Sequence, residues 1–399
     1  MSNEDVSNND VSNKDVSKKD LSEEGLSTRE VYKQDASKQD AFTVDASVGA
    51  VQTDAVQTEA VQTEAEHTGA VLTEAVLTGA VLTGAVLTQA IQPNRQGSGR
   101  HILIVAHTGR DDSLAAGVAV CRQLQDAGLT PVLTDDEFDD LVRFAPDLSP
   151  VAMLGTDVQI ADLEIVIVLG GDGTILRAAE LTRGCGAPLL GVNLGHVGFL
   201  AESEREDLTE TVVRVLERDY EVEERMTLNV RVKVDSQVVY ETWALNEATV
   251  EKASRERMLE VVIEVDGRPL SSFGCDGVVM STPTGSTAYS FSAGGPVVWP
   301  SVDALLLVPL SPHALFARPL VVGPQSALAV EVLDRTQGTG VLWCDGRRTH
   351  DLPRGARVVV RRSPTPVRLA RLASAPFTDR LVNKFSLPVG GWRGEGSRS

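Results

Sequence analysis

The strongest candidate for chemistry in this 399-residue sequence is the stretch VLGGDGT at residues 168–174. It places one carboxylate, Asp172, among Gly170, Gly171 and Gly173 directly after an apolar run. Glycines after a strand let the backbone approach a ligand closely, and free N–H groups at the start of the next helix can bind phosphate. The spacing matches neither the dinucleotide pattern GxGxxG nor the P-loop pattern. We therefore expect a phosphate-binding loop of another type.

Asp172 is the unusual member of this loop, because a carboxylate beside a phosphate is repelled unless it has a task. It could accept the proton of a hydroxyl that attacks a phosphoryl group, or it could bind Mg²⁺. A third interpretation is structural, with Asp172 capping a helix that begins near Thr174. The residues alone leave these three alternatives open.

A second cluster of polar residues lies in STPTGSTAYS at residues 281–290. Its small hydroxyl side chains and its glycine could hydrogen-bond ribose or phosphate oxygens at short range, although such clusters also form ordinary turns. Two further polar features interrupt apolar surroundings, the pair Asn246-Glu247 and the residue Asp276. Buried carboxylates and amides need partners, so sugar hydroxyls or an amide ligand would suit them. Asp276 could equally be a turn residue.

The elements that must position these loops alternate between strand and helix from residue 100 to residue 219. Apolar runs of buried-strand length occur at 101–106, 130–134, 164–169 and 188–193. Helix-like stretches occur at 113–126, 175–182 and 208–218. This alternation predicts an N-terminal Rossmann-like α/β domain with a parallel sheet and right-handed crossovers. Ligands gather at the carboxyl ends of such strands, and GGDGT lies at one of those ends.

From residue 220 to about residue 365 the hydrophobic pattern changes to a period of two, which is typical of strands. Strand-like stretches occur at 229–235, 238–243 and 259–265. The last of them leads into an Asp266-Gly267 turn that predicts a hairpin. We therefore expect a C-terminal β-rich domain, a β-sandwich, and a fold class of α/β plus all-β.

The two ends of the chain differ from both domains. The closing segment 366–399 contains a helix-like stretch at 376–385, which we expect to pack on one of the two domains. Packing back on the α/β domain is one of the two alternatives that the sequence leaves open. Residues 1–99 form a tail and linker with 16 Asp and Glu against 7 Lys and Arg, and the sequence repeats every five residues from Asp5 to Ile91.

A step of five residues gathers an apolar face on neither a helix nor a strand. Glu, Lys, Gln or Gly also stand where a pentapeptide-repeat coil needs a small buried side chain. We therefore interpret residues 1–99 as a disordered, low-complexity tail, with a weakly helical stretch near 69–91 as the alternative.

The composition narrows the classes of partner. The formal net charge is −19 and no basic run is sustained, which argues against nucleic acid or an anionic membrane as a partner. No apolar stretch reaches the roughly 18 residues of a membrane span, and the N-terminus does not resemble a signal peptide. The four cysteines are widely separated and lack metal-ligand spacing. We expect a cytoplasmic protein with reduced thiols.

Taken together, these motifs resemble the NAD kinase family over essentially residues 100–395. The resemblance rests on GGDGT at 170–174, on Asn246-Glu247, on DGVVMSTPTGSTAYSFSAGGP at 276–296 and on PLSPHALFARPLV at 309–321. HTGR at 107–110 and SAPFTDRLVNKF at 374–385 are most similar to the actinobacterial branch. The resemblance implies transfer of a phosphoryl group from ATP or polyphosphate to the 2′-hydroxyl of the adenosine ribose of NAD. The product is NADP, and Mg²⁺ or another divalent metal is required.

The resemblance also assigns residues to the site. The proton acceptor falls on Asp172, and the residues expected to hold phosphate are Gly170, Gly171, Gly173 and Thr174. The further residues expected to contact NAD or nucleotide are Arg177, Asn193, Asn246, Glu247, Arg257, Asp276, Thr287, Ala288, Tyr289, Ser290, Phe291 and Ser292. Phe199 would lie near the adenine. Many relatives carry Gln where this chain has Arg347, which could pair with a phosphate instead.

Two other functions remain as alternatives to an NAD kinase with NAD and ATP as substrates. One is a related kinase of the GGDGT type acting on a lipid or sugar hydroxyl, although no apolar mouth or basic membrane face is evident. The other is a non-catalytic dinucleotide sensor, although a sensor has no need of Asp172 beside phosphate. The resemblance further implies a homo-oligomer, either a dimer or a tetramer.

Overall fold

The computed structural model describes residues 99–389, apart from 108, 196–197, 202, 205–206, 256 and 373–375. All of these residues belong to the unit Ile91–Ser399. The tail expected at 1–99 therefore lies, except for its last residue, outside the described residues. Its disorder stays a prediction.

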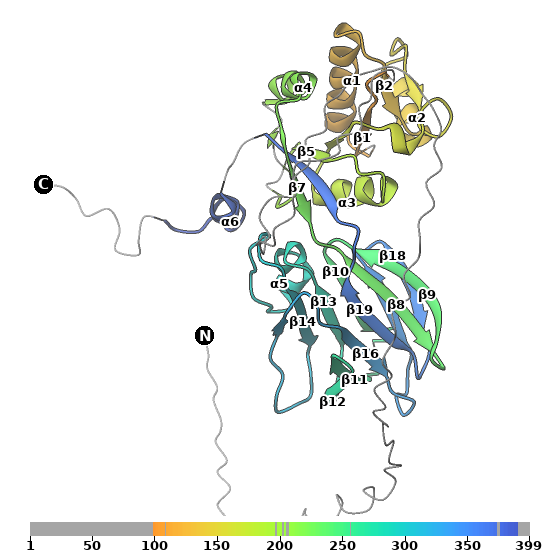
Figure 1. The fold of residues 1–399 in the computed structure, drawn as a ribbon, viewed down its shortest axis with the longest axis vertical. Coiled ribbons are helices and arrows are strands. Elements are labelled where there is room, and N and C mark those ends of the chain that lie inside the picture. The colour runs from red at the N-terminus through yellow and green to blue at the C-terminus, as the bar shows by residue number, and fades with distance from the viewer. Residues whose placement is uncertain are drawn as a thin grey trace, which may run out of the picture. The chain divides into compact units, whose positions relative to one another are not determined.

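The first domain is built on an eight-stranded sheet whose strands alternate with helices along the chain (Figure 1). Its strands are β1 Ile102–Ala106, β2 Pro131–Leu133, β3 Ala152–Met153, β4 Ile165–Leu169, β5 Leu189–Asn193, β6 Ser203–Glu204, β7 Glu221–Arg225 and β20 Val367–Arg371. Their order is β3-β2-β1-β4-β5-β20-β7, with β6 paired to β5. Strands β1 to β5 pair in parallel, whereas β7 runs antiparallel to β20 at the edge.

Helices cover both faces of this sheet. They are α1 Asp111–Asp126, α2 Asp135–Phe144, α3 Asp172–Leu181 and α4 Leu208–Glu217. Ile102 packs in one buried cluster with Leu124 of α1, and its neighbour Leu103 packs in another with Ile175 of α3. Successive side chains of β1 thus point to opposite covered faces. A strand in this position needs a continuous apolar run, which is the pattern seen in the sequence.

The second domain is a sandwich of two six-stranded sheets. The first sheet has the order β15-β14-β13-β10-β17-β18 and comprises β10 Glu247–Lys252, β13 Gly277–Ser281, β14 Leu305–Leu310, β15 Leu320–Val322, β17 Gly340–Cys344 and β18 Arg348–Leu352. The second has the order β12-β11-β16-β19-β8-β9 and comprises β8 Leu228–Val234, β9 Gln237–Ala244, β11 Leu259–Val265, β12 Arg268–Cys275, β16 Leu328–Val332 and β19 Arg357–Arg362. Every pairing within these two sheets is antiparallel.

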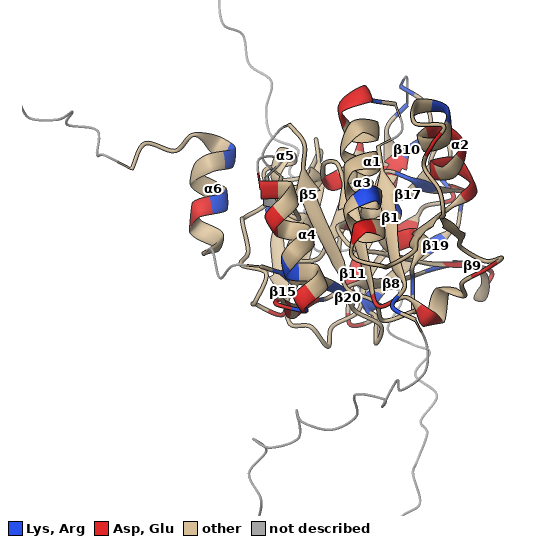
Figure 2. Ribbon diagram, turned by 90° about the horizontal axis from the view of Figure 1, so that it is seen from above, with Lys and Arg blue, Asp and Glu red and all other residues tan. Residues whose placement is uncertain are grey.

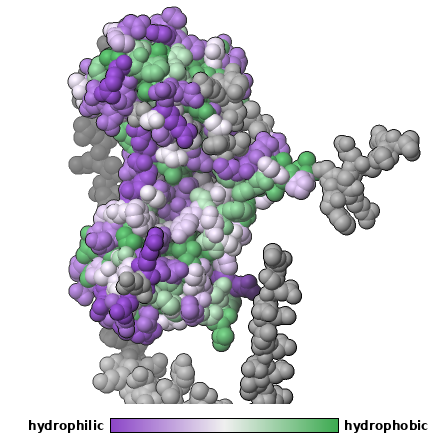
Figure 3. All heavy atoms as spheres, turned by 180° about the vertical axis from the view of Figure 1, so that it is seen from behind, coloured by the Kyte–Doolittle hydropathy of each residue, from purple (hydrophilic) through white to green (hydrophobic). Residues whose placement is uncertain are grey.

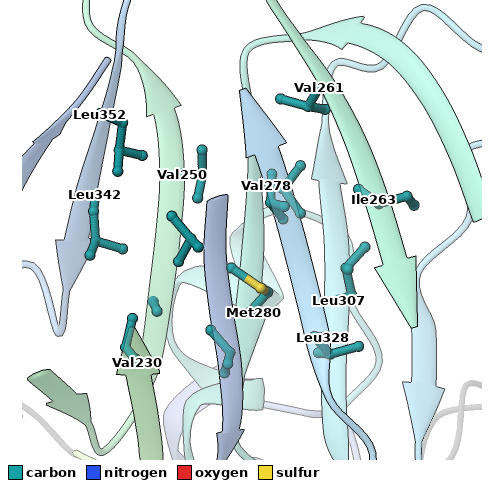
Figure 4. Close-up of a cluster of buried hydrophobic side chains, with 14 of the residues drawn as sticks. Val230, Val250, Val261, Ile263, Val278, Met280, Leu307, Leu328, Leu342 and Leu352 are labelled. Atoms are coloured by element: carbon teal, nitrogen blue, oxygen red, sulfur yellow. The ribbon is translucent and has the colours of Figure 1, made fainter. Parts of the chain in front are cut away.

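The two sheets of the sandwich share one apolar core (Figure 4). Val250, Val278 and Leu307 come from the first sheet, and Val230 and Val261 from the second. All five side chains are fully buried. Alternate residues of each strand enter this core, which explains the period of two in the sequence from residue 229 onward. The expected fold class, α/β plus all-β, is confirmed.

The boundary expected at residue 220 differs from the structure by one strand, since β7 belongs to the first sheet, whereas the boundary at residue 365 falls between β19 and β20. β7 and β20 pair with each other and extend the first sheet, so the chain returns to the α/β domain after the sandwich. β7 has the sequence EVEER and lies at the sheet edge, whereas inner strands such as β1 and β4 are continuous apolar runs with covered faces. A short polar strand therefore offers no apolar run by which the sequence could assign it to the first sheet.

Helix α2 was missed from the sequence. Acidic residues occupy its first turn and continue along it, so α2 is largely red in Figure 2. Acidic side chains at a helix N-terminus are favourable because they face the positive end of the helix dipole. Thr134 caps the helix by accepting a hydrogen bond from the Glu137 amide, and the string Thr-x-x-Glu is a capping box that could have revealed it.

Short helices complete the described fold. They are the 3₁₀ helices η1 Ile160–Asp162 and η3 Thr284–Thr287, the single turn α5 Tyr289–Ser292, and the closing helix α6 Phe377–Phe385. Among the described residues, no helix is long and apolar enough to cross a membrane.

Candidate active site

A pocket of about 540 Å³ lies where β1, β4 and β5 end and α3 begins. Its lining residues are Ala106, His107, Gly109, Arg110, Ser113, Gly170, Gly171, Gly173, Thr174, Arg177, Asn193, Leu194, Gly195 and Arg347. Most of the phosphate-binding residues expected from the sequence are thus brought together, and Arg347 reaches the same pocket from the sandwich. The described lining includes three arginines and no carboxylate, which suits an anionic ligand.

The glycines of GGDGT have distinct roles in this pocket. Gly170 has φ of 155°, and a Cβ atom there would lie 2.4 Å from the Thr174 hydroxyl, so only glycine fits. Gly171 and Gly173 have open space where a Cβ would stand. The backbone of these two residues is therefore open to a ligand at the N-terminus of α3, where N–H groups and the helix dipole favour phosphate.

Asp172 does not cap α3, so the helix-cap interpretation is wrong. The helix begins at Asp172 itself, its N-cap residue is Gly171, and no side chain caps it. The carboxylate instead accepts two hydrogen bonds of 3.1 Å, from the amide of Phe199 to Oδ2 and from the amide of Leu200 to Oδ1. A Cβ atom on the neighbouring Gly198 would lie 2.4 Å from Oδ1. The loop after β5 therefore holds the carboxylate in a fixed orientation.

Arg177 is anchored on the floor of the pocket. Its Nη2 atom donates to the Ala106 carbonyl at 2.7 Å and to the carboxylate of Glu137, which is fully buried. Burial raises the pKa of Glu137, and Arg177 counteracts this by favouring the ionised form. Glu137 was not identified from the sequence, because its role depends on α2.

A second group of predicted residues gathers where β10 begins in the sandwich. Asp345 accepts hydrogen bonds from the amides of Leu245 at 2.9 Å and Asn246 at 2.7 Å, and Arg348 donates to it at 2.8 Å. Burial raises the pKa of Asp345, and these hydrogen bonds oppose that effect. Asp345 thus fixes the backbone of the Asn246-Glu247 pair, a role that the sequence did not reveal.

Glu247 is the most perturbed carboxyl group of this cluster. It is 7% exposed, and burial raises its pKa to about 8, assisted by the negative charge of Asp345. The backbone amide of Tyr289 donates a hydrogen bond that partly offsets this rise. Within the described part of the chain, Oε2 of Glu247 has no hydrogen-bond partner. A buried acceptor without a partner indicates that a ligand donor belongs there.

The STPTGSTAYS loop lies against this group. Thr282 donates its hydroxyl to the Leu245 carbonyl at 2.6 Å, and a Cβ on Gly285 would lie 2.0 Å from the Asn246 carbonyl oxygen. The predicted residues Thr287, Ala288, Tyr289, Ser290, Phe291 and Ser292 follow in η3 and α5. Tyr289 and Phe291 are exposed, and the hydroxyl of Ser290 is buried without a partner among the described residues.

Two predicted contact residues lie apart from the first pocket. Asp276 forms a 2.5 Å ion pair with Lys252 at the end of β10 that is opposite Glu247. Burial raises the pKa of Tyr289, and the negative charges of Glu251, Glu247 and Asp276 add to this effect. Arg257 lines a separate pocket of about 350 Å³ together with His313. The structure does not bring Arg257 to Asp172, and its NAD contact stays a prediction.

Contacts between the two domains close the first pocket on its sandwich side. Arg347 donates to Glu180 of α3 at 2.9 Å, and Arg348 lies 3.3 Å from the same carboxylate. Phosphate pairing by Arg347, which the sequence left open, is thus compatible with its position in the pocket lining. Glu180, which accepts the hydrogen bond from Arg347, and Arg348, which contacts the same carboxylate, belong to no motif that would identify them from the sequence.

Comparison with known proteins identifies matching families. The model of the ATP-NAD kinase N-terminal domain matches residues 102–220, and that of the ATP-NAD kinase C-terminal domain matches residues 245–372. The NAD kinase of Leifsonia xyli subsp. xyli is 75% identical over 299 residues, covering 75% of this chain and 98% of that protein. The NAD kinase of Thermobifida fusca is 60% identical over 301 residues, covering 74% of this chain and 92% of that protein.

Solved structures share the fold. A yeast NADH kinase complexed with NADH aligns with a TM-score of 0.65 at 23% identity, over 76% of this chain and 91% of that chain. An NAD kinase from Archaeoglobus fulgidus in complex with ATP aligns with a TM-score of 0.55 at 23% identity, over 72% and 100%. At this identity the likeness concerns the fold alone.

The repeated tail also has a match. A family model of pentapeptide repeats, in 8 copies, matches residues 63–91. The five-residue pattern of this segment is thus that of the pentapeptide-repeat family, and this match corrects the expectation that the segment fits such a coil poorly. These residues lie outside the described part of the chain.

The contact between Gly198 and Asp172 generates a prediction about stability. Gly198→Ala should lower the free energy of unfolding by about 1–3 kcal/mol, because the added methyl displaces the carboxylate from the two amides. Urea unfolding followed by circular dichroism measures this. Gly323→Ala, where a Cβ meets open space, should change little. Equal stability of both variants would contradict the close contact.

The environment of Glu247 predicts a dependence of stability on pH. Its pKa is higher in the folded protein than the ordinary value of 4.5, so the folded state binds this proton more tightly than the unfolded state. Relative to Glu247→Gln, the wild type should be most stable below pH 4.5 and should lose stability progressively up to about pH 8. Urea unfolding at several pH values measures the difference, and a difference that stays constant from pH 4.5 to 9 would contradict the prediction.

Proposed function

The chain belongs to the NAD kinase family, and we propose that it transfers the γ-phosphoryl group of ATP to the 2′-hydroxyl of the adenosine ribose of NAD, giving NADP and ADP. The observation that carries the proposal is the fixed carboxylate of Asp172 at the start of α3, beside a cationic, glycine-lined pocket. The names of the relatives support NAD and ATP as the substrates.

We assign the phosphates of ATP to the pocket at the N-terminus of α3. The open backbone of Gly171 and Gly173 offers N–H donors, and the guanidinium of Arg177 is held in place by Glu137 and by the end of β1. Fixed donors of this kind stabilise charge that develops during phosphoryl transfer without having to reorganise. Arg347 adds a further cation from the sandwich.

Asp172 is assigned as the proton acceptor. Each of its oxygens accepts one backbone hydrogen bond, and a carboxylate oxygen has a second lone pair for another donor. The 2′-hydroxyl of NAD would donate to one of these sites, and its proton would pass to Asp172 as the oxygen bonds to the γ-phosphorus. The bond to the leaving ADP oxygen breaks in the same transfer.

The NAD side of the site is assigned to the sandwich. Oε2 of Glu247 lacks a partner among the described residues, and a ribose hydroxyl is a suitable donor for it. Asn246 lies next to it, the amide of Tyr289 donates to Glu247, and the ring of Tyr289 is 39% exposed and offers an apolar face.

A divalent metal fits this site as a companion of ATP. Among the described residues, no group of three His, Cys, Asp or Glu could hold a metal by itself, and the pocket lining contains no carboxylate. Mg²⁺ commonly keeps several waters and is held by substrate phosphates with one or two carboxylates. Asp172 is the adjoining carboxylate that would contribute. When bound, the ion would neutralise part of the phosphate charge.

Neither alternative function has an observation in its favour. Both family matches are to ATP-NAD kinase domains, not to lipid or sugar kinases. A dinucleotide sensor would not need a carboxylate held by two amides beside a phosphate pocket. The cytoplasmic location expected from the sequence stays a prediction.

Replacement of Asp172 tests the proposed chemistry. Asp172→Asn should lower kcat for NADP formation by about 10²- to 10⁴-fold, because the amide cannot accept the proton. NADP can be measured with a dehydrogenase that uses NADP and not NAD, in the presence of Mg-ATP. Asn keeps the size of the side chain but can accept only one of the two amide hydrogen bonds. The affinity for NAD, measured by calorimetry, should still stay within about threefold of the wild type, because the residues assigned to NAD lie in the sandwich.

The matched control is Asp126→Asn, at the exposed C-terminal end of α1. It should leave NADP formation unchanged. Wild-type protein that binds NAD but forms no NADP would contradict the kinase proposal. Nearly full activity of Asp172→Asn would contradict the proton-acceptor assignment.

We also propose that the protein forms the dimer or tetramer expected from the sequence. Apolar residues reach the surface of the sandwich, which is the lower body in Figure 3. Leu315, Phe316 and Val321, on or next to β15, are 111%, 58% and 52% exposed. Exposed large apolar groups in one short segment are typical of an interface.

Light scattering after size exclusion should therefore give a dimer or tetramer for the wild type. Phe316→Glu should reduce the oligomeric state, because a buried charge would be left without a partner. Val238→Glu, on the exposed side of β9, should not change it. A monomeric wild type would contradict the proposal.

A further inference from the structure

The closing helix α6 lies against the loop that holds Asp172. Phe199 of this loop is 8% exposed, and its ring centroid lies 6.0 Å from that of Phe377 and 5.8 Å from that of Phe385, both in α6. The contact joins residues almost 180 positions apart in the sequence. Aromatic pairs at such distances add attraction beyond the burial of their area. The helix therefore fixes the side chain of the residue whose amide binds Asp172.

Arg380 fixes the backbone of the same loop. Its Nη1 atom donates to the carbonyl of Phe199 at 3.2 Å and to the carbonyl of Ala201 at 2.8 Å. The amides of Phe199 and Leu200 point the other way and donate to Asp172. The loop is thus held between a guanidinium on one side and a carboxylate on the other.

One peptide group joins the two charges directly. The carbonyl of Phe199 and the amide of Leu200 belong to the same planar peptide unit, so this unit accepts from Arg380 and donates to Asp172. Hydrogen bonds in such a chain polarise one another, and bonds to charged groups are the stronger ones. The positive charge of Arg380 therefore strengthens the donor that orients Asp172.

The same helix also contacts the sandwich. The ring of Phe385 stacks on that of Phe291 at 4.7 Å, and the ring of Phe377 meets Trp299 edge-on at 5.3 Å. Phe291 lies in α5, within the loop assigned to NAD. α6 therefore touches both the segment that orients Asp172 and the segment that would orient the hydroxyl donor.

We propose that Arg380 of α6 is a positioning residue for phosphoryl transfer, which acts through the Phe199–Leu200 peptide to hold the carboxylate of Asp172 in line with the hydroxyl of NAD. The inference rests on the proposed function of Asp172. It predicts that loss of Arg380 affects the chemical step more than the binding of either substrate, because a displaced proton acceptor still leaves both binding surfaces intact.

The experiment compares steady-state kinetics of NADP formation for the full chain and its variants. Arg380→Met keeps an unbranched apolar side chain but removes the donors. It should lower kcat by about 10- to 100-fold, the usual range for a hydrogen bond to a charged group, with KM for NAD and for ATP within about twofold. Arg380→Lys, which keeps the charge and can donate to a carbonyl, should recover part of the loss.

The matched control is Arg368→Met. Like Arg380, Arg368 donates to a backbone carbonyl, that of Gly186, and it pairs with Glu224, but it lies on β20 away from the loop. Its kcat and KM should equal those of the wild type. Thermal unfolding of Arg380→Met should remain cooperative, with full occupancy of the folded state at the assay temperature.

A double variant separates this inference from the function on which it rests. In an Asp172→Asn background, Arg380→Met should lower kcat by less than about twofold further, because both residues act on the same proton transfer from the hydroxyl of NAD. A full, additive loss in that background, or a rise of KM with kcat unchanged, would overturn the positioning role. If Asp172→Asn alone keeps its activity, the proposed function fails. If Asp172→Asn loses activity and Arg380→Met does not, only the present inference fails.

Discussion

The site depends on one interaction used twice, a carboxylate that accepts hydrogen bonds from two consecutive backbone amides. Asp172 binds the amides of Phe199 and Leu200, and Asp345 binds those of Leu245 and Asn246. In each case a side chain distant in sequence fixes the backbone conformation of a loop that has no regular hydrogen-bond ladder. Backbone donors that would otherwise lie unpaired are satisfied at the same time. The two loops so fixed are those to which we assign the reacting carboxylate and the NAD-binding pair.

The α/β side and the sandwich side of the site must also be held in a fixed arrangement. Two arginines stacked on one tryptophan at the junction of the domains hold them. Arg183, which follows α3, and Arg348, in β18, both lie over the ring of Trp243, at 4.1 and 4.6 Å. Burial lowers the pKa of Arg183 to about 10, and the positive charge of Arg348 adds to this effect. Glu180 forms an ion pair with Arg348, and Asp345 accepts a hydrogen bond from it, so the two carboxylates balance the charge. Because Arg348 contacts both Asp345 and α3, the NAD-binding pair and the helix of the phosphate loop share one anchor.

Residue types and spacing in the sequence were sufficient to predict the two domains and the GGDGT loop. Continuous apolar runs and strict alternation distinguish strands covered on both faces from strands of a sandwich, and glycines mark a close approach of the backbone. The residues that hold the site carboxylates could not be predicted, because they are distant from them in the sequence. Asp172 and Phe199 are more than 25 positions apart, and Asp345 and Asn246 about 100. β7 and β20 show the same limit. β7 lacks the apolar run of the inner strands, and its pairing with β20, which in turn pairs with β5, assigns both strands to the first sheet.

The distribution of charge explains how a chain with a net charge of −19 can bind two polyanions. Binding responds to the local field inside a cleft more than to the total charge, since low-dielectric walls reduce screening there. The described lining of the phosphate pocket has arginines and no carboxylate, whereas the residues assigned to NAD in the sandwich include the carboxyl groups of Glu247 and Asp276. A carboxylate on that side would be repelled by phosphate if it were ionised. Burial raises the pKa of Glu247 and so favours its protonated form. Its proton reduces that repulsion and leaves a carboxyl group able both to donate and to accept hydrogen bonds with ribose hydroxyls.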